Sequence, residues 1–107
     1  MINITYSPKR MMITAEGHAG YAEYGKDIVC AGVSALMQSL HPALLERGIR
    51  HQMHMIQEPN RMEVKADPEC EQRYPCIVAF ETVLAGLKEI AKAYPAHVSI
   101  KIERGER

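Results

Sequence analysis

The first sixteen residues show a strand-like alternation of apolar and polar positions. Residues 2–6 (INITY) alternate with a period of two, which is typical of a strand with one buried face. Ser7-Pro8-Lys9 then supplies turn residues, and the alternation resumes over residues 11–16 before ending at Gly17-His18. Two strands separated by so few residues favour a β-hairpin.

The next segment predicts a loop followed by a long helix. Residues 19–26 contain two glycines and no periodicity, so we expect a mobile loop. From Asp27 the apolar spacing becomes helical, and Gly48 follows as a helix stop. Gly32 lies inside this helix, where glycine costs about 1 kcal/mol relative to alanine, so we expect a close packing partner there. The predicted buried stripe is Val29, Val33, Leu36, Leu40 and Leu44.

The second half of the chain repeats this order. Residues 50–58 and 61–66 predict a second hairpin joined by Pro59-Asn60, and 67–73 form a charged connector. Tyr74-Pro75 places proline at a helix start, and Pro95 ends that helix. Residues 98–103 alternate as a last strand before the charged tail 104–107. The predicted stripe of the second helix is Ile77, Phe80, Leu84, Leu87, Ala91 and Tyr94.

The element order is therefore ββαββαβ. Amphipathic helices and alternating strands favour an α+β fold, a two-layer α/β sandwich with one mixed sheet and two long helices packed on one face. A chain of 107 residues fits a single domain over residues 1–107. The other face of the sheet is expected either to be solvated or to pair with a second copy.

The charge balance and the cysteines narrow the functional classes. Thirteen basic and thirteen acidic residues cancel, which argues against direct nucleic-acid binding, because nucleic-acid binders need a basic face. The start of the chain lacks the apolar run of a signal peptide, and no run approaches the roughly 20 residues of a membrane span. We therefore expect a cytoplasmic protein without a membrane partner. Three cysteines, an odd number, indicate reduced thiols.

Cys30 occupies a position that favours two different interpretations. With Asp27 as N-cap, its carboxylate is expected to accept a hydrogen bond from the amide of Val29 or Cys30. The positive end of the helix dipole favours a thiolate in the first turn, whereas the negative charge of Asp27 opposes it. Cys30 lies at the border of the apolar stripe, on the side of Ser34. It is either a small buried hydrophobic residue or a nucleophile.

His18 makes the second interpretation more specific. A strand end, a glycine-rich loop and a helix start bring His18 and Cys30 to one edge of the sheet, where His18 can act as the base. Amides of the first helical turn are candidates for stabilising an oxyanion. Gly17 allows backbone conformations closed to other residues before His18. Tyr21 and Tyr24 are expected either to close over an extended peptide or to pack against the sheet.

Other polar clusters are weaker candidates. His51 and His54 point to opposite faces of a strand, and the Cys70–Cys76 spacing is wider than that of usual zinc ligands, so neither a zinc site nor a redox pair is favoured. We expect both cysteines to serve packing. Met53 and Met55 are interpreted as core or dimer contacts rather than as part of a substrate groove.

Two segments carry a resemblance to a known family. GHA at 17–19 and GKDIVCAGVSAL at 25–36 resemble the signature of the ribosomal-processing cysteine protease family, Prp, and the likeness in length and element order extends over the whole chain. The resemblance implies a homodimeric cysteine endopeptidase that removes the N-terminal extension of large-subunit ribosomal protein L-twenty-seven, cutting after an aromatic residue. It implies neither a metal nor an organic cofactor. By the same likeness His18 is the general base and Cys30 the nucleophile, and Gly17, Asp27 and Ser34 support the site.

The residues alone leave a non-enzymatic alternative open. The same loop and helix edge would also suit a ribosome- or protein-binding module that grips a partner without chemistry. Cleavage of a peptide that contains the ribosomal extension separates the two hypotheses.

Overall fold

The computed structural model describes residues 1–23, 25–57 and 60–103, and the predicted ββαββαβ order is confirmed. Tyr24, Pro59 of the predicted hairpin junction and the tail 104–107 lie outside the described residues. The strands are β1 (Ile2–Ser7), β2 (Met12–Glu16), β3 (His51–Gln57), β4 (Asn60–Ala66) and β5 (Val98–Ile102). The helices are α1 (Ile28–Glu46) and α2 (Arg73–Ala93), preceded by a 3-10 helix, η1, at Cys70–Gln72.

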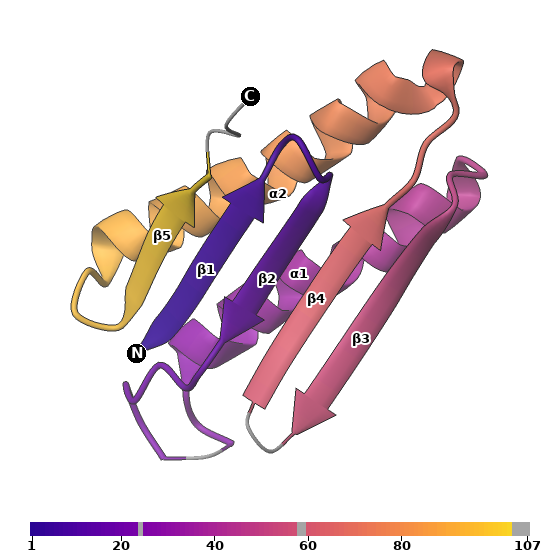
Figure 1. The fold of residues 1–107 in the computed structure, drawn as a ribbon. Helices are drawn as coiled ribbons and strands as arrows, with labels where there is room; N and C mark the ends of the chain where they lie inside the picture. The colour runs from indigo at the N-terminus through magenta and orange to yellow at the C-terminus, as the bar shows by residue number, and fades with distance from the viewer. Residues whose placement is uncertain (24, 58–59, 104–107) are drawn as a thin grey trace.

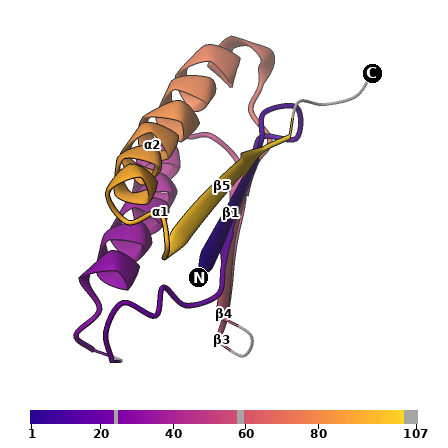
Figure 2. The same cartoon turned by 90° about the vertical axis from the view of Figure 1, so that its left-hand side faces the viewer.

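The strands form one mixed sheet in the order β3-β4-β2-β1-β5. The β1–β5 pair is parallel, and the other pairs are antiparallel. Both helices cover the same face of this sheet (Figures 1 and 2). The predicted α+β architecture with two helices on one face is therefore confirmed.

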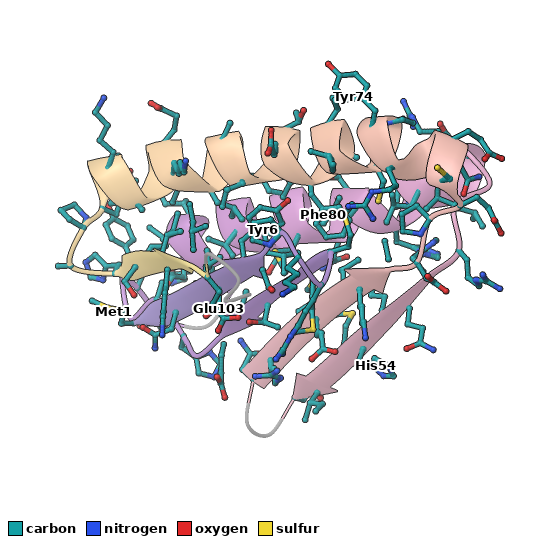
Figure 3. All side chains as sticks on the ribbon, turned by 45° about the horizontal axis from the view of Figure 1, so that its top comes forward. Met1, Tyr6, His54, Tyr74, Phe80 and Glu103 are labelled. Atoms are coloured by element: carbon teal, nitrogen blue, oxygen red, sulfur yellow. The ribbon has the colours of Figure 1, made fainter. Side chains whose placement is uncertain are left out.

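The core lies between the sheet and the helices. Alternate strand residues point into it, as the sequence period requires, and the Tyr6 ring stacks on Phe80 with ring centroids 6.0 Å apart (Figure 3). Burial of such side chains stabilises the fold by about 1.5–3 kcal/mol each. The most deeply buried include Ile4, Ile13, Met37, Leu40, Leu44, Val64, Phe80 and Leu87.

The buried stripe of α1 differs from the prediction at one position. Met37 is fully buried, whereas Leu36 is only half-buried and lies over α2. A Cβ built on Gly86 would lie 2.9 Å from Leu36 Cδ1, so the glycine makes room for this side chain. Leu36 therefore belongs to the helix–helix contact, and Met37 takes its place against the sheet.

The stripe of α2 is also rotated relative to the prediction. Cys76 and Val83 are buried, whereas Ile77, Ala91 and Tyr94 are only partly buried. The helix packs against α1 as well as the sheet, which moves the buried arc away from a single periodic row. The expected partner of Gly32 is Ile90, whose Cδ1 would lie 3.1 Å from a Cβ built on the glycine.

The length and apolarity of α1 correct one expectation. Among the helices of the described ranges, α1 is long and apolar enough to cross a membrane by length and composition, with 19 residues and a mean hydropathy of 1.5. We expected no such segment from the sequence. A core helix passes the same test, and here one face of α1 packs against the sheet and α2.

One end of the sheet brings together segments that lie far apart along the chain. β2 and β3 end there, and β1, β4 and β5 begin there, next to the first turn of α1 (Figure 1). The register places Ile2 opposite Val98 and Glu16 opposite Arg61 at this end. Residues that lie far apart along the chain therefore meet beside the loop that joins β2 to α1.

Candidate active site

Cys30 lies in the first turn of α1, as predicted, and its thiol is half-buried at the border of the core. Its Sγ accepts a hydrogen bond from the backbone N–H of Ala19, with a nitrogen–sulfur distance of 3.3 Å. Ala19 itself is buried, with 2% of its surface exposed. The loop after β2 therefore closes against the helix directly at the sulfur.

Asp27 is the N-cap of α1, and its carboxylate accepts hydrogen bonds from the preceding loop as well as from the helix. One oxygen, Oδ1, accepts from the N–H groups of Val29 and Cys30 at 3.0 Å each. The other oxygen, Oδ2, accepts from Tyr21 at 3.0 Å and from Ala22 at 3.3 Å. These N–H donors, Cys30 foremost, hold the pKa of the Asp27 carboxyl below its usual range, because they favour the charged form. Asp27 thus ties the loop to the start of α1.

The same contacts reduce the number of helix amides that remain candidates for stabilising an oxyanion. The N–H groups of Val29 and Cys30 donate to the Asp27 carboxylate, and that of Ala31 donates to the Asp27 carbonyl. These three first-turn N–H groups are therefore already engaged within the protein. The Ala19 N–H lies at the sulfur instead.

Gly17 fixes the backbone just before His18. Its φ of +103° is a conformation that L side chains rarely adopt, and a Cβ there would collide with the carbonyl oxygen of Met1. Its N–H donates to the Asn60 carbonyl at 2.9 Å, and Asn60 Nδ2 donates back to the Gly17 carbonyl at 2.8 Å. The predicted need for glycine at position 17 is confirmed. Asn60, at the start of β4, is a site residue that we did not anticipate from the sequence.

The side chain of His18 is exposed and lines the same cavity as Cys30. This cavity has a volume of about 640 Å³. No hydrogen bond joins the His18 ring to Cys30 or to any other residue in the part of the chain that the structure describes. The predicted pair is therefore brought to one cavity, but no hydrogen bond joins the two side chains. Asp27, Ser34 and Asn60 also line this cavity.

Cys30 also lines a second hollow, whose volume is about 530 Å³. Cys30, Ser34 and Asn60 line both hollows, so the thiol sits between them. Met55 is 58% exposed and lines this second hollow, so its interpretation as a core residue is wrong, whereas its alternative role as a dimer contact stays a prediction. Met53 is partly buried and packs against the core, as expected. Two hollows that share Cys30 in their lining leave room for a peptide chain near the sulfur.

The aromatic residue of the loop packs against the far end of α2. The Tyr21 ring meets Tyr94 and His97 edge-on, with centroids 5.3 and 5.5 Å apart. Nδ1 of His97 donates to the Ala19 carbonyl at 2.8 Å. Tyr21 thus packs on the end of α2 rather than on the sheet, whereas its closing over a bound peptide stays a prediction. His97 was also missed, because it belongs to an irregular connection without periodicity.

The remaining histidines and cysteines lie elsewhere. His51 pairs with His41 across an Nε2–Nδ1 distance of 2.8 Å, and the described residues contain no group of three potential metal ligands. Cys76 is buried, as its packing role requires, and burial raises the pKa of its thiol. Cys70 is exposed, so the expectation that it serves packing is wrong.

Comparison with known proteins places this arrangement in a family. The family model described as cysteine protease Prp matches residues 1–99. A ribosomal processing cysteine protease Prp of Mycoplasma pneumoniae is 30% identical over 104 residues, covering 97% of each chain. The protein of the same name from Mycoplasma genitalium is 33% identical over 114 residues, covering 99% of this chain and all of the relative.

Solved structures show the same fold. The Prp of S. aureus with a covalently linked product peptide has a TM-score of 0.84 at 21% identity, covering 96% of this chain and 100% of that chain. The same protease with a substrate peptide has a TM-score of 0.78 at 20% identity, with the same coverage. The chain thus belongs to the Prp family of ribosomal processing cysteine proteases, hydrolases that act on peptide bonds.

Proposed function

We propose that this protein is an endopeptidase that removes the N-terminal extension of the ribosomal protein L-twenty-seven precursor, with Cys30 as nucleophile and His18 as general base. The observation that carries this proposal is the position of the Cys30 sulfur. It lies at the border between two hollows, beside a backbone N–H and in the same cavity as His18. Gly17, Asp27 and Ser34 hold or line this site.

The chemistry needs only these two side chains and water. His18 takes the proton of the Cys30 thiol, and the thiolate attacks the carbonyl carbon of the scissile peptide bond. When the carbon–nitrogen bond breaks, the leaving amine takes the proton from the His18 imidazolium. Water, deprotonated by His18, then hydrolyses the thioester and releases the acid and the free thiol.

The hydrogen-bonding state of His18 fits a base that engages only with substrate. Its ring is exposed and has no partner among the described residues. Catalytic hydrogen bonds are often absent in a free enzyme and form in the complex with substrate. Binding of the extension along the two hollows would place the scissile carbonyl between His18 and Cys30.

The shape and lining of the hollows support an extended peptide as substrate. Met55 and Met62 give the second hollow apolar surface, which suits the aromatic residue before the cleavage site. Crystal structures of the S. aureus relative contain a substrate peptide and a product peptide. We propose the corresponding precursor peptide as the partner here, with a homodimer acting in the cytoplasm. Light scattering of the purified protein tests the dimer.

Peptide cleavage tests the proposed function. We expect the protein to cut a synthetic peptide that spans the precursor extension at one bond, as followed by mass spectrometry. Cys30→Ala should abolish cleavage, and His18→Ala should lower kcat/KM by roughly 10²–10⁴-fold, the usual contribution of a general base.

Matched controls come from residues outside the site. Cys70→Ala and His54→Ala replace an exposed cysteine and an exposed histidine, and both variants should cleave as the unmodified protein does. Tight binding of the peptide without cleavage would instead support the non-catalytic binding module.

A further inference from the structure

Two consecutive hydrogen bonds connect a histidine near the C-terminal end of the chain to the Cys30 sulfur. Nδ1 of His97 donates to the carbonyl of Ala19 at 2.8 Å, and the N–H of Ala19 donates to Cys30 Sγ at 3.3 Å. A carbonyl oxygen can only accept, so Nδ1 of His97 carries the proton. The two hydrogen bonds use the two peptide groups on either side of the Ala19 Cα. Together they fix the orientation of this residue.

His97 is itself held by the framework of the fold. Its backbone N–H donates to the Tyr94 carbonyl at 2.9 Å, at the end of α2. Its carbonyl accepts the N–H of Ile2 at 2.9 Å, at the start of β1. The half-buried ring also lies edge-on to Tyr21. His97 is thus anchored between a helix end and the sheet, whereas Ala19 belongs to a loop without regular structure.

The Ala19 N–H needs such support. The loop is fixed on one side of Ala19 by the two hydrogen bonds between Gly17 and Asn60, and on the other side by the Tyr21 and Ala22 N–H groups on Asp27. Between these anchors the Ala19 N–H makes only an N–H···S contact, which is weak, and Gly20, with its positive φ, follows directly. The hydrogen bond from His97 acts on the next peptide group and restrains Ala19 from its other side.

We propose that His97 is a positioning residue for the reaction: by holding the Ala19 carbonyl, it keeps the Ala19 N–H directed at the Cys30 sulfur. A hydrogen bond donated to a thiolate favours the charged, nucleophilic form. The amides of the first turn of α1 do not supply this donor, because Asp27 occupies those of Val29 and Cys30. This inference rests on the proposed role of Cys30 as nucleophile.

The test compares His97→Ala with His97→Asn. Asparagine carries its amide nitrogen on Cγ, as histidine carries Nδ1, so it keeps a donor for the Ala19 carbonyl. The readout is the rate at which iodoacetamide alkylates Cys30 between pH 5 and pH 10, followed by mass spectrometry in the absence of substrate. Exposed Cys70 serves as the reference thiol within the same molecule.

We expect His97→Ala to slow alkylation of Cys30 roughly tenfold at neutral pH and to shift its pH–rate profile upward, while Cys70 reacts as before. His97→Asn should restore both. In peptide cleavage, His97→Ala should lower kcat and leave KM nearly unchanged. A residue with only a structural role would lower the melting temperature without changing the Cys30 profile.

Two results would overturn the proposal. One is an unchanged Cys30 profile in folded His97→Ala, and the other is a folded His97→Asn protein that reacts as slowly as the alanine variant. If His97→Ala does not fold, His97→Gln, whose donor lies one methylene further out, replaces it in the same comparison. Alkylation of Cys30 needs no substrate, so its rate can be interpreted independently of the peptide-cleavage assay. A protein that shows the His97 effect but cuts no precursor peptide refutes the proposed function alone.

Discussion

Replacing Gly17 by alanine tests how the start of the site is held. The φ of Gly17 is +103°, and a Cβ at this position would collide with the backbone carbonyl oxygen of Met1. The residue cannot easily move away, because its N–H and carbonyl are both bonded to Asn60, at 2.9 and 2.8 Å. The added methyl group must therefore be accommodated by strain or by displacing β1 or β4.

The change in the free energy of unfolding caused by Gly17→Ala is the sum of opposing contributions. A non-glycine residue in a sparsely populated backbone conformation costs about 1–3 kcal/mol. Alanine also lowers the conformational entropy of the unfolded chain, which stabilises the folded protein by about 0.4–1 kcal/mol. The collision with Met1 adds to the cost and has no counterpart in the unfolded state. We expect Gly17→Ala to lower the free energy of unfolding by about 2 kcal/mol.

Gly20→Ala is the matched control. Gly20 also has a positive φ, +68°, but a Cβ there would meet nothing within 4 Å. Gly20→Ala should lower the free energy of unfolding by about 1 kcal/mol or less. Urea unfolding of the two variants measures the difference. Gly17→Ala should in addition reduce peptide cleavage, because His18 follows directly. If Gly17→Ala is as stable as Gly20→Ala, the contact with Met1 does not constrain the site as argued.

Three further substitutions test the N-cap Asp27, the buried Tyr6 hydroxyl and the core residue Met37. The Asp27 pKa is lowered by its N–H donors, so the ionised carboxylate stabilises the fold above about pH 4, and this contribution is lost as the pH falls through the lowered value. The stability advantage over Asp27→Asn in thermal unfolding should therefore be full at pH 7 and shrink below pH 4; a constant difference would contradict the hydrogen bonds described. The Tyr6 hydroxyl is buried with no partner among the described residues, so Tyr6→Phe should stabilise the protein by about 1 kcal/mol in urea unfolding, and a loss of that size would show that the hydroxyl is satisfied. Met37→Ala should cost about 2–5 kcal/mol in urea unfolding, clearly more than Leu36→Ala, because only Met37 is fully buried; equal costs would restore the predicted stripe.

The sequence predicted the architecture because local periodicity determines it. Alternation in residues 2–6 and helical spacing after Asp27 were sufficient to place the elements, and the sheet with two helices on one face follows from their amphipathic faces. The exchange of Met37 for Leu36 was not predictable in this way. Both side chains fit an apolar stripe, and the choice depends on the close approach of the second helix at Gly86.

In the candidate site too, the local contacts were predictable from the sequence and the long-range contacts were not. Asp27 and Cys30 interact over three residues, so cap preferences were enough to place them. Asn60 and His97 contact the loop across 43 and 78 residues of sequence, and nothing in their local surroundings marks them. Only the pairing of β4 with β2, and of β5 with β1, brings them to the loop.

The hydrogen bonds of Asp27 at the start of α1 explain why the position of the loop matters for Cys30, the proposed nucleophile. The first turn of a helix favours an anion, but the Asp27 carboxylate already takes the N–H groups of Val29 and Cys30. A thiolate at Cys30 competes there with a fixed negative charge, which opposes its formation. Stabilisation from the helix is thereby offset, and the N–H of Ala19 becomes the donor available to the sulfur. The reactivity of this proposed nucleophile is consequently expected to depend on where the loop lies, and a peptide that displaces the loop must itself donate a hydrogen bond to the sulfur in place of Ala19.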